Sequence, residues 1–109
     1  MLLIQCVFKV NETELAIFSV LSGCGPAIVD VFIEALSDGT VLNGMNRALS
    51  YDVISEMIVG AAKLAQQDKH PAALKDAVTS PGGSTIKAIA TLEKHGFRYG
   101  LIDAVDSVK

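Results

Sequence analysis

The chain has 109 residues, the usual size for one hydrophobic core, and its net charge of −3 with scattered basic residues argues against nucleic acid or an anionic membrane surface as a partner. Half of the residues are apolar and only 19% are charged, so we expect an oligomer with a large apolar interface. No apolar run approaches the ~18 to 20 residues that cross a bilayer, and residues 1–4 lack the basic start of a secretory signal, so a cytoplasmic location without membrane contact is expected.

The first elements in the chain are predicted to be a short strand and a helix. Residues 2–10 are rich in Leu, Ile, Val and Phe with partial alternation, which is typical of a strand. A lone strand at one end has no partner, so we interpret it as an edge separated from a larger sheet. Asn11 can then cap a helix over residues 12–21, with acidic side chains in its first turn.

A second helix is predicted over residues 26–42. The glycine-containing residues 22–25 are expected to break the first helix, and Pro26 is tolerated in the first turn of the next one. Its apolar arc is too wide for a surface helix, with Asp30 and Glu34 marking only a narrow polar stripe. We therefore expect it to lie between its own core and a second subunit.

Apolar periodicity, proline placement and glycine stops predict four further helices, over residues 47–67, 71–78, 84–94 and 97–108. Gly96 is expected to end the third of these. The apolar residues of the last two are expected to point toward a core. The chain is thus predicted to form a six-helix, all-α domain over residues 11–109, behind a strand remnant over residues 1–10.

The turn at residues 78–85, Val-Thr-Ser-Pro-Gly-Gly-Ser-Thr, is the candidate ligand site. Pro81 disfavours a helical Ser80, and the two glycines that follow let a ligand approach the backbone. The N–H groups of residues 83–86 would be free at the positive end of a helix dipole, which suits a carboxylate or phosphate. Thr85 could direct its hydroxyl at a neighbouring atom of that ligand. The alternative is a simple connection with a serine N-cap.

The remaining polar residues do not suggest an enzyme site of their own. His70 is interpreted as a surface loop residue, His95 as a cation at a helix C-terminus, and Cys6 and Cys24 as small buried apolar residues. No nucleophile with an adjacent base, carboxylate pair or metal-ligand cluster stands out. Such a domain fits chemistry performed by a cofactor, whose binding site would lie elsewhere because no G-x-G-x-x-G follows a strand.

Several segments together resemble the C-terminal domain of the pyrroline-5-carboxylate reductase family. The resemblance covers nearly all of residues 10–109. It is carried by Leu-Ser-Gly-Cys-Gly-Pro-Ala at 21–27, Val-Gly-Ala-Ala-Lys at 59–63, His-Pro with Leu-Lys-Asp at 70–76, the turn at 78–85, and Gly-Phe-Arg and Asp-Ala-Val at 96–98 and 103–105.

The resemblance implies a dimerisation domain of the 6-phosphogluconate dehydrogenase C-terminal-like type, intertwined with its mate in a homodimer or higher oligomer. Residues 1–10 would be the last strand of a Rossmann domain that the chain lacks. The implied activity is the reduction of 1-pyrroline-5-carboxylate to L-proline with NADPH or NADH, the final step of proline biosynthesis. This chain would supply the dimer interface and the substrate site, and would be inactive without the Rossmann half.

The family's functional residues are carried over position by position. The resemblance implies that the substrate carboxylate lies on backbone amides of residues 82–85 and that the catalytic Thr85 hydroxyl lies near the ring nitrogen, with no metal involved. The substrate-binding set is Val78, Ser80, Gly82, Gly83, Ser84 and Thr85, and Ser22, Cys24 and Pro26 would lie near the nicotinamide. The chain departs from the family pattern with Cys24 in place of a serine, Ile28 in place of an aromatic residue and Asp68 in place of a glutamate.

Two other functions remain open at this stage. The first is a non-catalytic helical interaction module that keeps the packing pattern without the ligand. The second is the helical domain of another two-domain dehydrogenase that acts on a different small acid.

Overall fold

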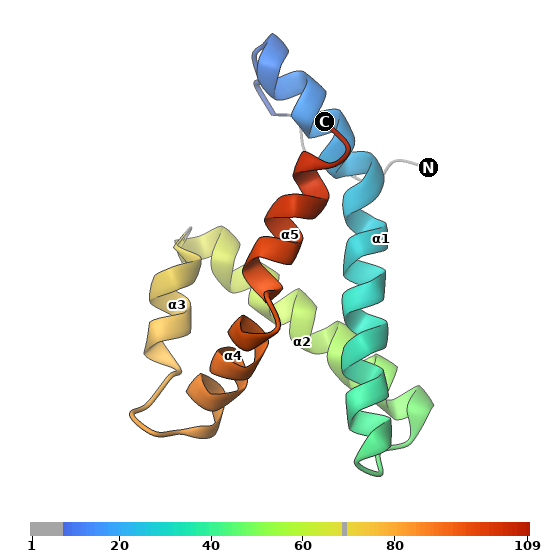
Figure 1. Ribbon diagram of the computed structural model, residues 1–109, viewed down its shortest axis with the longest axis vertical. Coiled ribbons are helices and arrows are strands. Elements are labelled where there is room, and N and C mark those ends of the chain that lie inside the picture. The colour runs from blue at the N-terminus through green and yellow to red at the C-terminus, as the bar shows by residue number, and fades with distance from the viewer. Residues whose placement is uncertain (1–7, 69) are drawn as a thin grey trace.

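The computed structural model describes residues 8–68 and 70–109, and these form an all-helical domain (Figure 1). The all-α class is therefore confirmed. The strand expected over residues 2–10 lies almost wholly outside the described residues, and residues 8–10 have irregular backbone. The described part of the chain contains five helices: α1 (Glu12–Leu42), α2 (Arg47–Asp68), α3 (Pro71–Ala77), α4 (Ser84–Lys94) and α5 (Phe97–Asp106).

Helix α1 begins where the sequence predicts. The Asn11 side chain accepts a hydrogen bond from the Glu14 N–H at 2.8 Å, and the Glu14 carboxylate accepts one from the Asn11 N–H at 3.0 Å. This capping box satisfies two amides that would otherwise lack partners. The two acidic residues of the first turn also lie at the positive end of the helix dipole.

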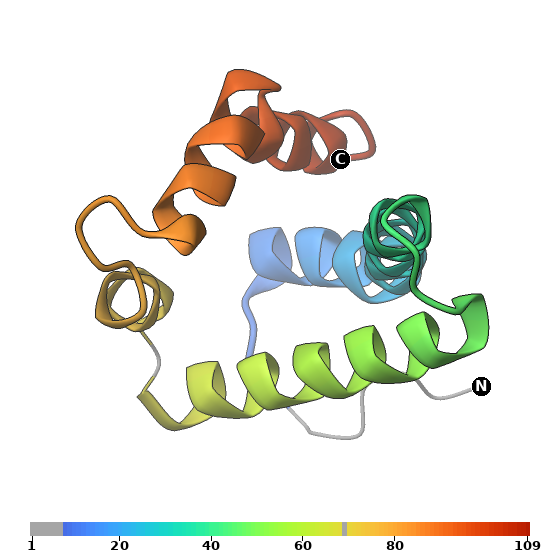
Figure 2. The same ribbon diagram turned by 90° about the horizontal axis from the view of Figure 1, so that it is seen from below.

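The expected break at residues 22–25 is wrong, because α1 continues through it, and the six expected helices become five. Pro26 lies inside α1, where it removes the hydrogen bond to the Ser22 carbonyl and bends the helix instead of ending it. The bend is visible as the change of direction between the blue and the cyan parts of α1 (Figures 1 and 2). A glycine costs a helix only about 1 kcal/mol, so the glycines alone do not stop it.

Helix α1 also corrects the expectation that no segment is long enough to cross a bilayer. Its 31 residues include an 18-residue window of mean hydropathy 1.9, and none of that window is buried within the chain. Such a helix meets the length and composition of a membrane span. An interface helix of an oligomer has the same composition. The apolar surface of α1 is therefore expected to be covered either by lipid or by another protein chain.

The helices pack as pairs around α1. Helix α1 contacts α2, α2 contacts α3, and α4 contacts α5. In Figure 2 the α4–α5 pair lies on one side of α1 and α2 lies on the other. The radius of gyration is 15.9 Å, whereas a compact domain of this length has about 13 Å. The single chain is therefore more open than an ordinary domain.

The single chain has almost no hydrophobic core of its own. Among the described residues, Ile54 is the buried hydrophobic side chain, at 4% exposure. The accessible surface is 8738 Å², whereas a folded monomer of 11.5 kDa exposes about 5,800 Å². The inward orientation expected for the apolar residues of α4 and α5 is thus wrong for most of them within one chain: Ile86, Leu92, Phe97, Leu101, Ile102 and Val108 are at least one-third exposed.

Candidate functional site

The predicted ligand turn forms between α3 and α4 and is held by one backbone hydrogen bond. The Gly83 N–H donates to the Ser80 carbonyl at 3.0 Å, with Pro81 and Gly82 as the two central residues. Gly82 has a φ of +71°, as the third residue of a type II turn requires. A Cβ on Gly83 would lie 2.6 Å from Ser80 Oγ and 3.2 Å from the Ser80 carbonyl oxygen. A side chain at position 83 would require the Ser80 hydroxyl to rotate and the Ser80 carbonyl to move by a few tenths of an ångström.

Three backbone amides, rather than four, remain free at the start of α4. The expectation that the Gly83 N–H is free is wrong, because the turn itself uses it. The first helical hydrogen bond runs from the Lys87 N–H to the Gly83 carbonyl at 3.3 Å. The N–H groups of residues 84–86 precede it and have no partner among the hydrogen bonds of the described residues.

The alternative of a serine N-cap is not what the structure has at this helix. Gly83 is the N-cap residue of α4, with extended backbone and no side-chain hydrogen bond. The turn residues are exposed apart from the half-buried Thr79 and Gly83. Three N–H groups without a partner in the described part of the chain and the exposed Thr85 thus lie together in the first turn of α4.

Two contacts that the sequence reasoning missed cap the two ends of α3, the helix before the turn. The His70 Nδ1 accepts from the Ala73 N–H at 3.1 Å, so His70 is the N-cap of α3 and not a free loop residue. The Thr79 hydroxyl lies 3.1 Å from the Lys75 carbonyl and closes the last turn of α3. The position of His70 directly before Pro71 at a helix start is the signal that could have identified the first of these.

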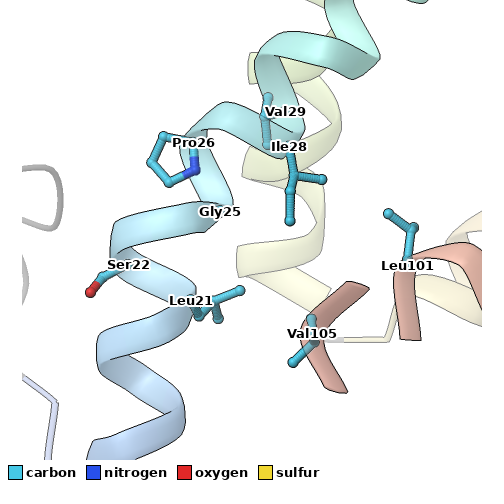
Figure 3. Close-up of a pocket in the computed structure, with 8 residues that line it drawn as sticks. All are labelled: Leu21, Ser22, Gly25, Pro26, Ile28, Val29, Leu101 and Val105. Carbon is cyan, nitrogen blue, oxygen red and sulfur yellow. The ribbon is translucent and has the colours of Figure 1, made fainter. Parts of the chain in front are cut away.

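The residues carried over as nicotinamide neighbours lie on α1 at its bend. Ser22, Gly25 and Pro26 line a shallow groove of about 430 Å³ together with Leu101 and Val105 of α5. Figure 3 shows Leu21 and Ile28 pointing toward Val105, whereas Ser22 and Pro26 point to the other side of α1. The expectation of a buried Cys24 is wrong, because its thiol is free and exposed. Cys6 lies outside the described residues.

A single chain does not bring the two parts of the predicted site together. The substrate-binding set from Val78 to Thr85 gathers in the α3–α4 turn, while Ser22, Cys24 and Pro26 lie at the bend of α1. Figures 1 and 2 both place these two regions on opposite sides of the molecule. A site that contains both would need residues from two chains.

The described residues contain no group of three or more His, Cys, Asp or Glu side chains that could hold a metal ion. What the turn offers instead is charge recognition by backbone dipoles and one hydroxyl. Free N–H groups at a helix start are suited to bind a small anion.

An all-helical fold with unpartnered apolar faces and an amide-presenting turn defines this chain as a helical oligomerisation domain with a candidate anion site. The family model described as "Pyrroline-5-carboxylate reductase dimerisation" matches residues 12–109. The chain belongs to this family.

Curated relatives agree with this assignment over a part of their length. The chain is 46% identical to the pyrroline-5-carboxylate reductase of Synechocystis over 100 residues, which are 91% of this chain and 38% of that relative. It is 48% identical to the enzyme of Glycine max over 100 residues, 91% of this chain and 36% of the relative. The chain therefore spans less than two-fifths of these relatives.

Solved structures show the same fold. The chain matches Plasmodium falciparum pyrroline carboxylate reductase, crystallised with NADP bound, at a TM-score of 0.86 and 37% identity, over 93% of this chain and 39% of that one. It matches 1-pyrroline-5-carboxylate reductase from Streptococcus pyogenes at a TM-score of 0.87 and 30% identity, again over 93% and 39%.

Proposed function

We propose that this chain is the dimerisation and substrate-binding part of a cytoplasmic pyrroline-5-carboxylate reductase, which reduces 1-pyrroline-5-carboxylate to L-proline with NADPH or NADH. The observation that carries the proposal is the α3–α4 turn, where three free amides and Thr85 stand at a helix start in a chain of this family. The substrate is a small ring acid, and its carboxylate is the anion that such a helix start favours.

The exposed apolar faces support a homodimer. A groove of about 790 Å³ runs between α1 and the α4–α5 pair, lined by Val31 and Phe32 on one side and by Leu92, Phe97 and Leu101 on the other. The surface exceeds that of a compact monomer by roughly half, an excess in the range that obligate interfaces bury. If a second copy of the chain covers these faces, the apolar surface of α1 is accounted for by a protein interface and does not require a membrane.

The turn orients the substrate for reduction. With the Gly83 N–H used inside the turn, the amides of Ser84, Thr85 and Ile86 bind the carboxylate. The Thr85 hydroxyl hydrogen-bonds the ring nitrogen as the imine becomes an amine. When bound, a reduced nicotinamide would supply the hydride that adds to the C=N carbon, and a proton from water would complete the amine at the ring nitrogen.

The groove at the bend of α1 fits only one end of such a cofactor. Its lining is almost entirely apolar and contains no basic side chain: Leu21, Ser22, Gly25, Pro26, Ile28, Val29, Leu101 and Val105. An uncharged nicotinamide ring fits this lining, whereas a pyrophosphate does not. We therefore assign the phosphates to a nucleotide-binding domain and expect no turnover from this chain alone. The turn of one chain would meet the α1 bend of its partner.

The substrate-site proposal is tested by titrating the chain with L-proline and following the amide shifts by NMR. We expect shifts at residues 84–86, because their N–H groups would bind the carboxylate. The start of α5 is an internal control, since Gly96 also caps that helix without a side-chain bond. Gly83→Ala, whose Cβ would displace the Ser80 hydroxyl and disturb the turn, is expected to weaken the binding that causes the shifts.

Two outcomes of this titration would contradict the substrate site. Equal shifts at the starts of α4 and α5 would mean general anion binding to helix ends. An absence of shifts at millimolar proline would favour the non-catalytic interaction module.

A further inference from the structure

The best-buried polar groups of the chain join α1 to α2. Ser37 of α1 and Ser50 of α2 are both 0% exposed, and their hydroxyl oxygens lie 2.6 Å apart. Ile54, one turn after Ser50, is the buried hydrophobic residue beside them in the described part of α2. The apolar faces of the chain are otherwise exposed, so the two serines are the least exposed side chains of the described residues.

The direction of each hydrogen bond in this cluster follows from counting protons. A serine hydroxyl has one proton to donate, and a carbonyl only accepts. Ser50 Oγ lies 2.8 Å from the Arg47 carbonyl, so Ser50 donates there. The bond between the two serines is then donated by Ser37, and Ser37 Oγ accepts from Arg47 Nη1 at 2.9 Å. The chain of bonds begins at the Arg47 guanidinium and ends at the carbonyl of the same residue.

The guanidinium that starts this loop is itself fixed. Arg47 Nη1 also donates to Asp38 Oδ1 at 2.7 Å, and the guanidinium carbon lies 5.8 Å from the centre of the Tyr51 ring. The hydrogen bond to Asp38 raises the pKa of Arg47, which is charged at neutral pH in any case. No buried side-chain nitrogen or oxygen among the described residues lacks a hydrogen-bond partner.

We propose that this closed loop sets the register of the α1–α2 hairpin within a single chain, before two chains associate. If α2 slipped by one turn along α1, the Ser37 hydroxyl would be buried without its partners Ser50 and Arg47, while Ser50 would keep its bond to the Arg47 carbonyl of its own helix. A buried hydroxyl without a partner costs free energy that a slip between apolar side chains does not. Helices α4 and α5 contact each other and meet α1 through the rings of Phe32 and Phe97, whose centroids lie 6.0 Å apart, beside an open groove. We therefore expect the order of α4 and α5 to depend on a second copy that fills this groove. Assembly therefore has two stages: a preformed hairpin, and then the α4–α5 pair.

Hydrogen exchange on the chain over a dilution series tests this order. We expect amide protection around Ser50, whose N–H donates to the Asn46 carbonyl at 2.9 Å, to be independent of concentration. Protection in α4 and α5 should fall on dilution. Ser50→Ala should lower hairpin protection in the dilute chain at least tenfold, whereas Ser55→Ala, an exposed serine on the same helix, should leave it unchanged.

The proposal is overturned if hairpin protection in the parent chain falls on dilution together with that of α5. It is also overturned if Ser50→Ala and Ser55→Ala have the same effect. If Ser50→Ala does not fold, the dilution series of the parent chain and of Ser37→Ala still tests whether the hairpin forms before the chains associate. Ser37→Ala is the milder variant, because Ser50 still donates to the Arg47 carbonyl when the Ser37 hydroxyl is missing. Ser37→Ala is expected to lower hairpin protection less than Ser50→Ala.

Discussion

Val31→Glu is expected to convert the chain from a dimer to a monomer at micromolar concentration. Val31 is 64% exposed in the single chain and lines the groove between α1 and α5, so the fold of one chain loses little when it is replaced. In the dimer, an unpaired carboxylate would lie in an apolar interface at a cost of about 3 kcal/mol. A symmetric dimer carries the change twice, so the dissociation constant should rise about 10⁴-fold. Sedimentation velocity measures it.

The matched control is Thr13→Glu, which adds the same charge to the same helix. Thr13 lies in the first turn of α1, where a carboxylate is favoured by the helix dipole. Its dissociation constant should stay within a few-fold of the parent value. A Val31→Glu chain that remains dimeric would remove this face of α1 from the interface.

Thr85→Ala is expected to lower kcat/KM by about 5- to 150-fold in an enzyme that joins this domain to a nucleotide-binding domain. The reason is the loss of one hydrogen bond to a group whose charge changes during reduction, worth about 1 to 3 kcal/mol. Thr85→Ser retains the hydroxyl and should recover most of the activity. Steady-state kinetics with 1-pyrroline-5-carboxylate as the varied substrate measures both.

Ser84→Ala separates the two roles assigned to the turn. The Ser84→Ala variant keeps the backbone N–H that would bind the carboxylate. It removes only the Ser84 hydroxyl, which has no role in the proposed reaction, so its kcat/KM should match that of the parent. If Thr85→Ala and Ser84→Ala both leave kcat/KM unchanged, Thr85 has no role in the reduction.

The sequence predicts those features that depend on neighbouring residues. Helices α2, α3 and α4 end within one residue of their expected bounds, because caps, prolines and periodicity act over a few positions. Gly96 follows the end of α4 as expected, and its φ of +72° is the left-handed conformation that glycine favours after a helix. The turn at Pro81 and Gly82 forms for the same local reason.

The features that depend on the rest of the structure were not predictable in this way. Pro26 favours a new helix locally, yet α1 continues through it with a bend. Periodicity identifies the apolar face of α5 but not which chain covers it, so residues expected to be buried, such as Ile102, are exposed in one chain. The wrong expectation for the Gly83 N–H has a different cause: Pro81 and Gly82 favour a type II turn, and the interpretation did not include the hydrogen bond that this turn makes with the N–H of its fourth residue.

The central claim is that the open apolar faces of this chain are covered by a second copy of itself. Sedimentation equilibrium of the chain without detergent tests it most directly. The account predicts a mass of about 23 kDa, twice the 11.5 kDa of one chain. A stable, fully helical species of 11.5 kDa, or a chain that is soluble only with detergent or lipid, would contradict it.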